Sequence, residues 1–145
     1  MRLRLSILVV SALFFVAGCG DSPTRPSSAP YSQTELHIGS GTEATSGAVV
    51  SVNYTGWLWD PSKTDGKGIQ FDSSTNAGGF AFTLGQGQVI AGWDRGVAGM
   101  KIGGIRRLVI PPSLAYGTAR FGPIPPDSTL VFDIELVDVQ TSAVP

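Results

Sequence analysis

The stretch FTLGQGQVIAGWDRGVAGM, residues 82–100, decides the fold because it holds the one clear helical period in the chain. Val89, Trp93, Val97 and Met100 follow one another at intervals of four, four and three residues. This spacing puts the four side chains on one side of a helix. The sequence therefore predicts a short amphipathic helix over residues 88–100.

The segments around this helix alternate in hydrophobicity with a period of two, which indicates half-buried strands. The alternating apolar residues are Val50, Val52, Tyr54, then Phe80, Phe82, Leu84, and finally Leu130, Phe132, Ile134, Leu136. Two further strands are predicted over 34–38 and 105–110, and long loops over the polar segment 58–70 and the Gly/Pro-rich segment 116–126. Several strands around one short helix predict an α+β domain with an antiparallel sheet that covers the helix.

The composition fits one globular domain. The chain has 145 residues, of which 42% are hydrophobic and 14% are charged, and this is too apolar for a disordered chain. The formal net charge is −1, and no basic stripe with interleaved aromatic residues is present, so no nucleic-acid partner is expected.

Acid–base, metal and cofactor chemistry are not expected. The one histidine, His37, precedes the first clear strand and has no partners in the sequence, so a surface position is predicted. No group of His, Cys, Asp and Glu has the spacing of a metal site. The run GQGQ at 85–88 lacks the lysine of a phosphate-binding loop.

The N-terminal segment is interpreted as a leader. Arg2 and Arg4 precede an apolar run over 5–17, which is shorter than the roughly 20 residues needed to span a bilayer. The segment ends in Val-Ala-Gly-Cys at 16–19, which resembles a bacterial lipobox; an ordinary secretory leader is the alternative.

This interpretation divides the chain into four parts. We expect a signal peptide over 1–18, a lipidated Cys19 with a flexible Ser/Pro-rich tether over 19–33, a folded domain over 34–140 and a tail over 141–145. More than one acyl chain on Cys19 would anchor the protein stably in a membrane. The predicted location is the cell envelope, on the periplasmic or extracytoplasmic side.

Five blocks of the sequence together resemble a known family. They are VNYTGWL (52–58), FDSS (71–74), FTLGQGQVIAGWDRGVAGM (82–100), LVIPPSLAYG (108–117) and IPPDSTLVFDIEL (124–136). In this order they are similar to the signature blocks of the FKBP-type peptidyl-prolyl cis-trans isomerases, over about residues 34–139. Each block alone is only moderately specific.

The resemblance implies a half-open antiparallel β-sheet wrapped around one short α-helix, with an aromatic pocket between them. It assigns the pocket floor to Trp93 and the donor groups to the backbone N–H of Ile90 and the hydroxyl of Tyr116, with Asp72 at the pocket edge. The remaining substrate-binding residues implied by the resemblance are Tyr54, Phe71, Phe82, Val89, Ile124 and Phe132. Phe80 and Leu136 are assigned to the core.

These residue types suit the isomerisation of an X–Pro bond, in which no proton or covalent bond has to move. The resemblance also implies proline-containing segments as substrates, macrolides as possible ligands, no cofactor, and a monomeric protein. Without the resemblance, Trp93 and Phe132 would be assigned to the core and Asp72 to a turn.

The sequence departs from the family pattern in three places. Many active relatives carry an arginine that pairs with the aspartate at the position of Asp72, and residues 75–79 contain none. The segment 58–70 is longer than in the family's short form. The flap over 118–125 is about one residue shorter than in many relatives and carries Phe121 and Pro123, so an altered substrate preference is expected. Two other functions therefore remain open: a non-catalytic chaperone or scaffold of the same fold, and a structural envelope lipoprotein.

Overall fold

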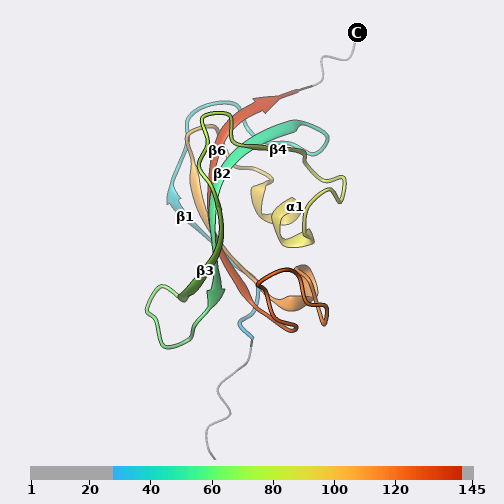
Figure 1. Ribbon diagram of the computed structural model, residues 1–145. Coiled ribbons are helices and arrows are strands. Elements are labelled where there is room, and N and C mark those ends of the chain that lie inside the picture. The colour runs from blue at the N-terminus through green and yellow to red at the C-terminus, as the bar shows by residue number, and fades with distance from the viewer. Residues whose placement is uncertain (1–27, 142–145) are drawn as a thin grey trace, which may run out of the picture.

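The computed structural model describes residues 28–141 as a curved antiparallel sheet with one short helix against its concave face (Figure 1). The elements are β1 (Ser32–His37), β2 (Val49–Trp59), β3 (Lys67–Ser74), β4 (Phe80–Thr83), α1 (Ala91–Val97), β5 (Ile105–Ile110), the 3-10 helix η1 (Pro112–Leu114) and β6 (Leu130–Gln140). The strand order is β1-β5-β6-β2-β3, and β4 also pairs with β2. The predicted fold class is confirmed.

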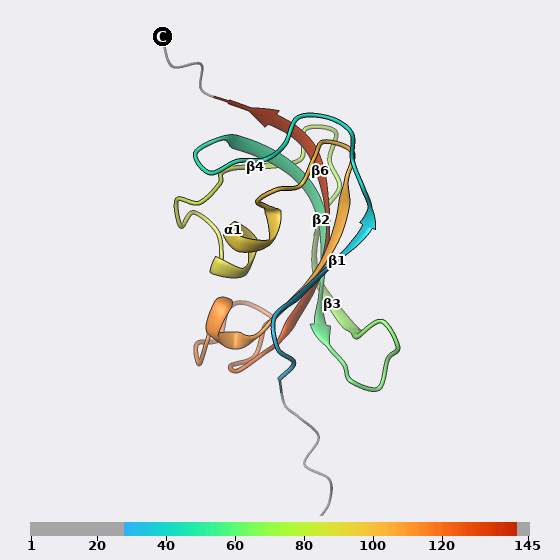
Figure 2. The same cartoon turned by 180° about the vertical axis from the view of Figure 1, so that it is seen from behind.

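The core fills the space between the helix and the concave face of the sheet. The strand residues that alternate with polar neighbours point into it, and Val50, Leu108, Ile134 and Leu136 are fully buried. Val97 of α1 closes the core from the helix side. Seen from behind, α1 lies to one side of the curved sheet, with β2 next to it and β1 farther from it (Figure 2).

Two glycines let α1 lie directly on β5. A Cβ atom at Gly92 would lie 2.4 Å from Cγ2 of Ile110, and one at Gly96 would lie 2.4 Å from Cδ1 of Leu108. Atoms cannot approach this closely, so only glycine permits the observed separation at these two positions. Because the glycines are four residues apart, they face the same strand.

Arg106 ties the C-terminal end of α1 to the edge of the sheet. Its Nη1 donates hydrogen bonds to the carbonyl oxygens of Gly96 (2.7 Å) and Ala98 (3.1 Å), and its guanidinium forms an ion pair with Glu35 of β1. Only 7% of Arg106 is exposed, and a buried charge is tolerated when it is paired and hydrogen-bonded in this way. These contacts connect β1, β5 and α1.

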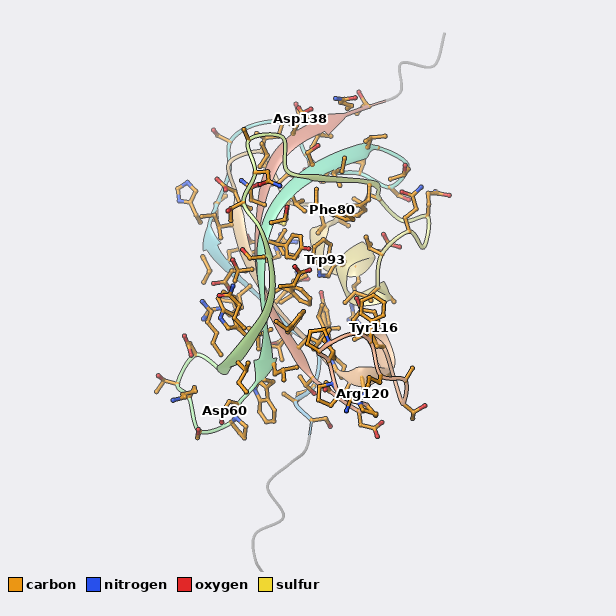
Figure 3. All side chains as sticks on the ribbon, viewed as in Figure 1. Asp60, Phe80, Trp93, Tyr116, Arg120 and Asp138 are labelled. Atoms are coloured by element: carbon orange, nitrogen blue, oxygen red, sulfur yellow. The ribbon has the colours of Figure 1, made fainter. Side chains whose placement is uncertain are left out.

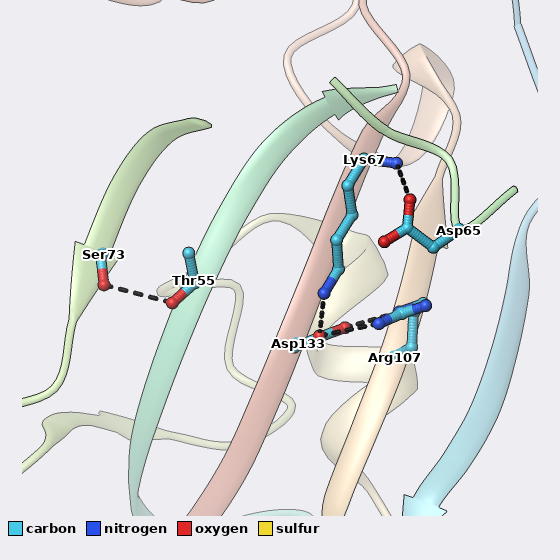
Figure 4. A network of polar contacts seen from close by, with 6 residues as sticks. All are labelled: Thr55, Asp65, Lys67, Ser73, Arg107 and Asp133. Carbon is cyan, nitrogen blue, oxygen red and sulfur yellow. Dashed lines mark hydrogen bonds and ion pairs between the residues drawn. The ribbon is translucent and has the colours of Figure 1, made fainter. Parts of the chain in front are cut away.

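A second polar network holds the opposite face of the sheet together (Figure 4). Asp133 of β6 accepts hydrogen bonds from Nε and Nη2 of Arg107 (2.7 and 2.9 Å) and from Nζ of Lys67 (2.6 Å). Burial alone would raise the pKa of Asp133, but the hydrogen bonds from Arg107 and Lys67 outweigh it and hold this pKa below its usual value. On the same face, the hydroxyls of Thr55 and Ser73 meet at 3.2 Å between β2 and β3.

Three predicted boundaries differ from the structure. The helix covers 91–97 rather than 88–100. The predicted loop 58–70 is strand at both ends: Trp57 pairs with Gln70 and Trp59 with Lys67, so the turn covers 60–66. The sequence did not predict this strand because β3 lies at an edge of the sheet and has exposed polar residues, so its hydrophobic alternation is weak.

The first strand begins at Ser32, within the predicted tether, because Ser32 and Gln33 already pair with β5. The predicted signal peptide, Cys19, most of the tether and most of the tail lie outside the described residues. No helix within 28–141 is long and apolar enough to cross a membrane.

Candidate active site

A pocket opens between α1, the concave side of β2, β3 and β6, and the segment after β5. Its volume is about 170 Å³, and a cavity of about 150 Å³ holds one benzene-sized ring. The lining residues are Tyr54, Phe71, Asp72, Phe80, Gln88, Val89, Ile90, Trp93, Tyr116 and Phe132. The pocket therefore has room for one ring-sized group against aromatic walls.

Trp93 lies at the centre of the aromatic cluster. It is 5% exposed, and its ring meets those of Tyr54 and Phe132 nearly edge-on, with centroids 4.9 and 5.2 Å apart. Edge-to-face pairs of this kind each contribute about 0.5–1.5 kcal/mol beyond the area they bury. Figure 3 shows Phe80, Trp93 and Tyr116 lying one above another beside the helix. The cluster is thus packed firmly enough to serve as a preformed floor.

The polar edge of the pocket depends on Tyr54 and Asp72. The Tyr54 hydroxyl donates a hydrogen bond to Oδ2 of Asp72 at 2.7 Å, and Oδ1 of Asp72 accepts one from the backbone N–H of Ser73 at 2.8 Å. Burial, then the hydrogen bond and charge of Asp72, raise the pKa of Tyr54 above its usual value. The tyrosine thus supplies a donor to Asp72 in a chain that lacks the arginine expected from the family pattern.

The two donor groups predicted at the pocket are both free to meet a ligand. Among the described residues, none accepts a hydrogen bond from the backbone N–H of Ile90 or from the hydroxyl of Tyr116. Burial raises the pKa of Tyr116, and the charge of Asp72 adds to this effect. The Tyr116 hydroxyl therefore keeps its proton at neutral pH and can donate it to an acceptor.

The segment between β4 and α1 forms a rigid rim beside these donors. Asp94 of α1 accepts hydrogen bonds from the backbone N–H groups of Gly85 (2.8 Å) and Gly87 (3.0 Å), one on each carboxylate oxygen. The side chain of Gln88 accepts another from the backbone N–H of Thr83 at 2.9 Å. We call residues 84–90 the rim segment.

Eight of the predicted site residues line the pocket, and two do not. Phe82 and Ile124 are 4% and 2% exposed and lie behind the wall; the Phe82 ring packs on Trp93 with centroids 5.8 Å apart. The sequence alternation placed Phe82 on the correct face of β4 but could not tell whether the cluster covers it.

Phe80 and Gln88 were missed. Phe80, which was assigned to the core, is 42% exposed and lies 6.2 Å from both Tyr54 and Trp93, measured between ring centroids. The prediction for Phe80 was wrong because an alternating pattern shows which face of a strand a side chain lies on. It does not show how far along the strand the helix covers that face. Leu136, the other residue assigned to the core, is fully buried.

A half-open antiparallel sheet with one short helix and an aromatic pocket between them is the architecture that the sequence resemblance implied. The sequence profile of the family described as FKBP-type peptidyl-prolyl cis-trans isomerase matches residues 40–137. The chain belongs to this family, and its folded part is an FKBP-type isomerase domain.

Individual relatives agree with this assignment. FK506-binding protein 1 of Gibberella zeae is 51% identical over 106 residues, which are 72% of this chain and 93% of that protein. The crystal structure of FkpA from Escherichia coli matches with a TM-score of 0.63 and 42% identity, over 77% of this chain and 49% of that one. The crystal structure of AtFKBP13 matches with a TM-score of 0.63 and 38% identity, over 79% and 98%.

Other relatives are much longer than the matched domain. The 46 kDa FK506-binding nuclear protein of Spodoptera frugiperda is 47% identical over 107 residues, which are 73% of this chain. The chain spans only 24% of the length of that protein and 21% of FK506-binding protein 4 of Neurospora crassa.

The predicted localisation in the cell envelope is contradicted by these curated relatives. They come from fungi and an insect, and one is named a nuclear protein. The Val-Ala-Gly-Cys segment that prompted the prediction of a bacterial lipoprotein lies outside both the described residues and the matched region. The other features behind the prediction, Arg2, Arg4 and the apolar run over 5–17, lie outside them too.

Proposed function

We propose that the domain catalyses cis–trans isomerisation of X–Pro bonds within this aromatic pocket. The observation that carries the proposal is the combination of ring-sized aromatic walls with unpaired donors that include Ile90 N–H and the Tyr116 hydroxyl. The proposal also rests on the family to which the chain belongs.

Isomerisation requires the pocket only to favour rotation about the X–Pro bond. Rotation about the X–Pro bond meets a barrier of about 18–20 kcal/mol, because it breaks amide resonance. A twisted amide has less charge separation than a planar one, so transfer from water to an aromatic pocket favours the twist. Donors aligned with the rotated carbonyl, rather than with the planar one, lower the barrier further.

Each residue then has a definite role. Trp93 supports the proline ring from below, and Tyr54, Phe71, Phe80 and Phe132 enclose it. Ile90 N–H and the Tyr116 hydroxyl bind carbonyl oxygens of the substrate. Asp72, oriented by Tyr54, contributes negative potential at the open edge, while Val89 lies at the rim. Phe82 and Ile124 support the wall from behind.

The substrates we propose are proline-containing polypeptide segments, with macrolides of the type that names the family's members as competing ligands, bound by a monomeric protein. A non-catalytic chaperone or scaffold is the second candidate. It is favoured by one observation, namely that Asp72 is held by an uncharged tyrosine rather than by a cation.

A protease-coupled assay on prolyl peptides tests the proposal. We expect the protein to accelerate isomerisation, and Phe132→Ala and Tyr116→Phe to reduce kcat/KM about tenfold or more, since each 1.4 kcal/mol of lost transition-state stabilisation is tenfold in rate. If peptides change the Trp93 fluorescence but their isomerisation is not accelerated, the scaffold function is correct instead.

A further inference from the structure

The rim segment carries a polar side chain that none of the roles above uses. Gln88 lines the pocket two residues before Ile90, and its Oε1 accepts the hydrogen bond from the backbone N–H of Thr83 at 2.9 Å. A backbone N–H can only donate, so the amide atom that faces Thr83 must be the oxygen. The orientation of the Gln88 amide is therefore fixed, with Nε2 turned away from Thr83.

This orientation leaves the Gln88 side chain with donors only. No described residue accepts a hydrogen bond from Nε2, and the oxygen is already occupied. A primary amide nitrogen offers two N–H groups and no acceptor. A ligand atom that forms a hydrogen bond with Nε2 of Gln88 must consequently be an acceptor.

The donor is also held in place before any ligand arrives. Asp94 fixes the preceding turn through Gly85 and Gly87, and Leu84, at the start of the rim segment, is completely buried. Ordering a side chain at an interface costs about 0.5–1.5 kcal/mol, and a preorganised side chain avoids most of this cost. A hydrogen bond to Gln88 would therefore add to affinity despite the exposure of the residue.

We propose that Gln88 is a substrate-binding residue whose Nε2 donates to a backbone carbonyl oxygen of the peptide outside the prolyl bond. This inference rests on the proposed function. A peptide whose carbonyl meets Ile90 N–H must pass along the rim segment, and Gln88 is the polar side chain that it meets there. Every peptide carries backbone carbonyls, so the contact favours longer substrates without selecting their sequence.

The test compares two peptides on the full-length protein: a minimal prolyl peptide, and the same peptide lengthened by two residues at each end. The quantity measured is the ratio of kcat/KM for the long peptide to that for the short one. Gln88→Glu is the informative variant, because a carboxylate can still accept from the Thr83 N–H but has no N–H to donate. Gln88→Met removes both functions without adding charge.

We expect Gln88→Glu and Gln88→Met to lower this ratio about three- to tenfold, as loss of one hydrogen bond predicts. The matched control is Gln86→Glu, which places the same charge on the same segment at an exposed residue outside the pocket lining. The control should leave the ratio unchanged.

An unchanged ratio in both Gln88 variants would overturn the inference, and so would an equal loss in Gln86→Glu, which would assign the effect to charge. The proposed function fails separately, if the wild-type protein accelerates neither peptide. In that case the same ratio is taken from dissociation constants measured by Trp93 fluorescence, and the same outcomes apply to Gln88.

Discussion

At the scale of single residues, the polar edge of the pocket depends on the hydrogen bond from the Tyr54 hydroxyl to Asp72, which also accepts one from the backbone N–H of Ser73. The same tyrosine packs its ring on Trp93, so it serves the wall and the edge together. The orientation of the carboxylate therefore depends on a residue that the aromatic cluster already holds.

Tyr54→Phe should keep the aromatic wall of the pocket and remove the hydrogen bond to Asp72 at its polar edge. We expect kcat/KM for prolyl peptides to fall about three- to tenfold, because Asp72 loses its only side-chain donor among the described residues while the ring stays in place. Thr55→Val is the matched control, since it removes a hydroxyl contact between the same two strands on the opposite face. If both variants lose activity equally, the effect comes from the strand pairing and not from Asp72.

At the scale of elements, the rim segment and α1 depend on each other through Asp94. The helix is only seven residues long, and isolated helices of this length are unstable, so its position depends on such contacts. Asp94 connects its first turn to the turn that precedes it in the chain.

Asp94→Ala should release the rim segment without unfolding the domain. We expect faster amide hydrogen exchange at Gly85 and Gly87, and a three- to tenfold lower kcat/KM, because the donors Gln88 and Ile90 lose their fixed positions. Asp94→Asn retains one acceptor oxygen, so its exchange rates and its kcat/KM should lie between those of wild type and Asp94→Ala. Unchanged exchange at both glycines in Asp94→Ala would contradict this account of the rim.

The contact between α1 and β5 permits a second prediction at this scale. Gly96→Ala improves helix propensity by about 1 kcal/mol, yet we expect it to lower the free energy of unfolding by about 1–3 kcal/mol, as overpacking does. The added methyl would lie 2.4 Å from Leu108 Cδ1, and Leu108 is fully buried, so any shift of its side chain disturbs the core.

Urea unfolding measures this change. The double variant Gly96→Ala with Leu108→Val supplies the missing space, and it should be less unstable than the sum of its two single changes. Strict additivity would show that the close approach of the helix is not the cause.

At the scale of the whole molecule, Asp133 joins three strands, because it binds Lys67 of β3 and Arg107 of β5 from its place in β6. Its folded-state pKa lies below the unfolded value. A carboxyl group of this kind adds stability above its unfolded pKa, near 3.8, and this stability is lost as the pH falls through the folded pKa.

Asp133→Asn should therefore destabilise the protein by about 1–3 kcal/mol at about pH 7, between the values for exposed and buried ion pairs. The difference from wild type should shrink as the pH falls from about 4 through the lower folded-state pKa, because the Asp133 carboxylate becomes protonated over this range. Glu135→Gln, an exposed neighbour on the same strand, serves as the control and should change little. A difference that stays constant with pH would contradict the ionic origin.

Some elements of the molecule could be predicted from the sequence, and others could not. Periodicity predicted α1 and the core face of β6, because burial imposes its spacing on residues such as Trp93 and Ile134. It did not predict β3, which pairs at an edge of the sheet and leaves Ile69 exposed. Gln88 gave no signal, since its use depends on a hydrogen bond to Thr83 that only the folded turn creates.

The glycines of α1 have a consequence for selectivity as well. Gly92 and Gly96 set how deeply the helix sits against β5, and the same helix carries Trp93, so they set the depth of the pocket from behind. Neither glycine lines the pocket. The size of the ring that the domain accepts can therefore be changed at positions that no ligand touches. A bulkier residue at Gly92 or Gly96, combined with a smaller residue in β5, would shift Trp93. This shift would change the preference between five- and six-membered rings while every wall residue stayed the same.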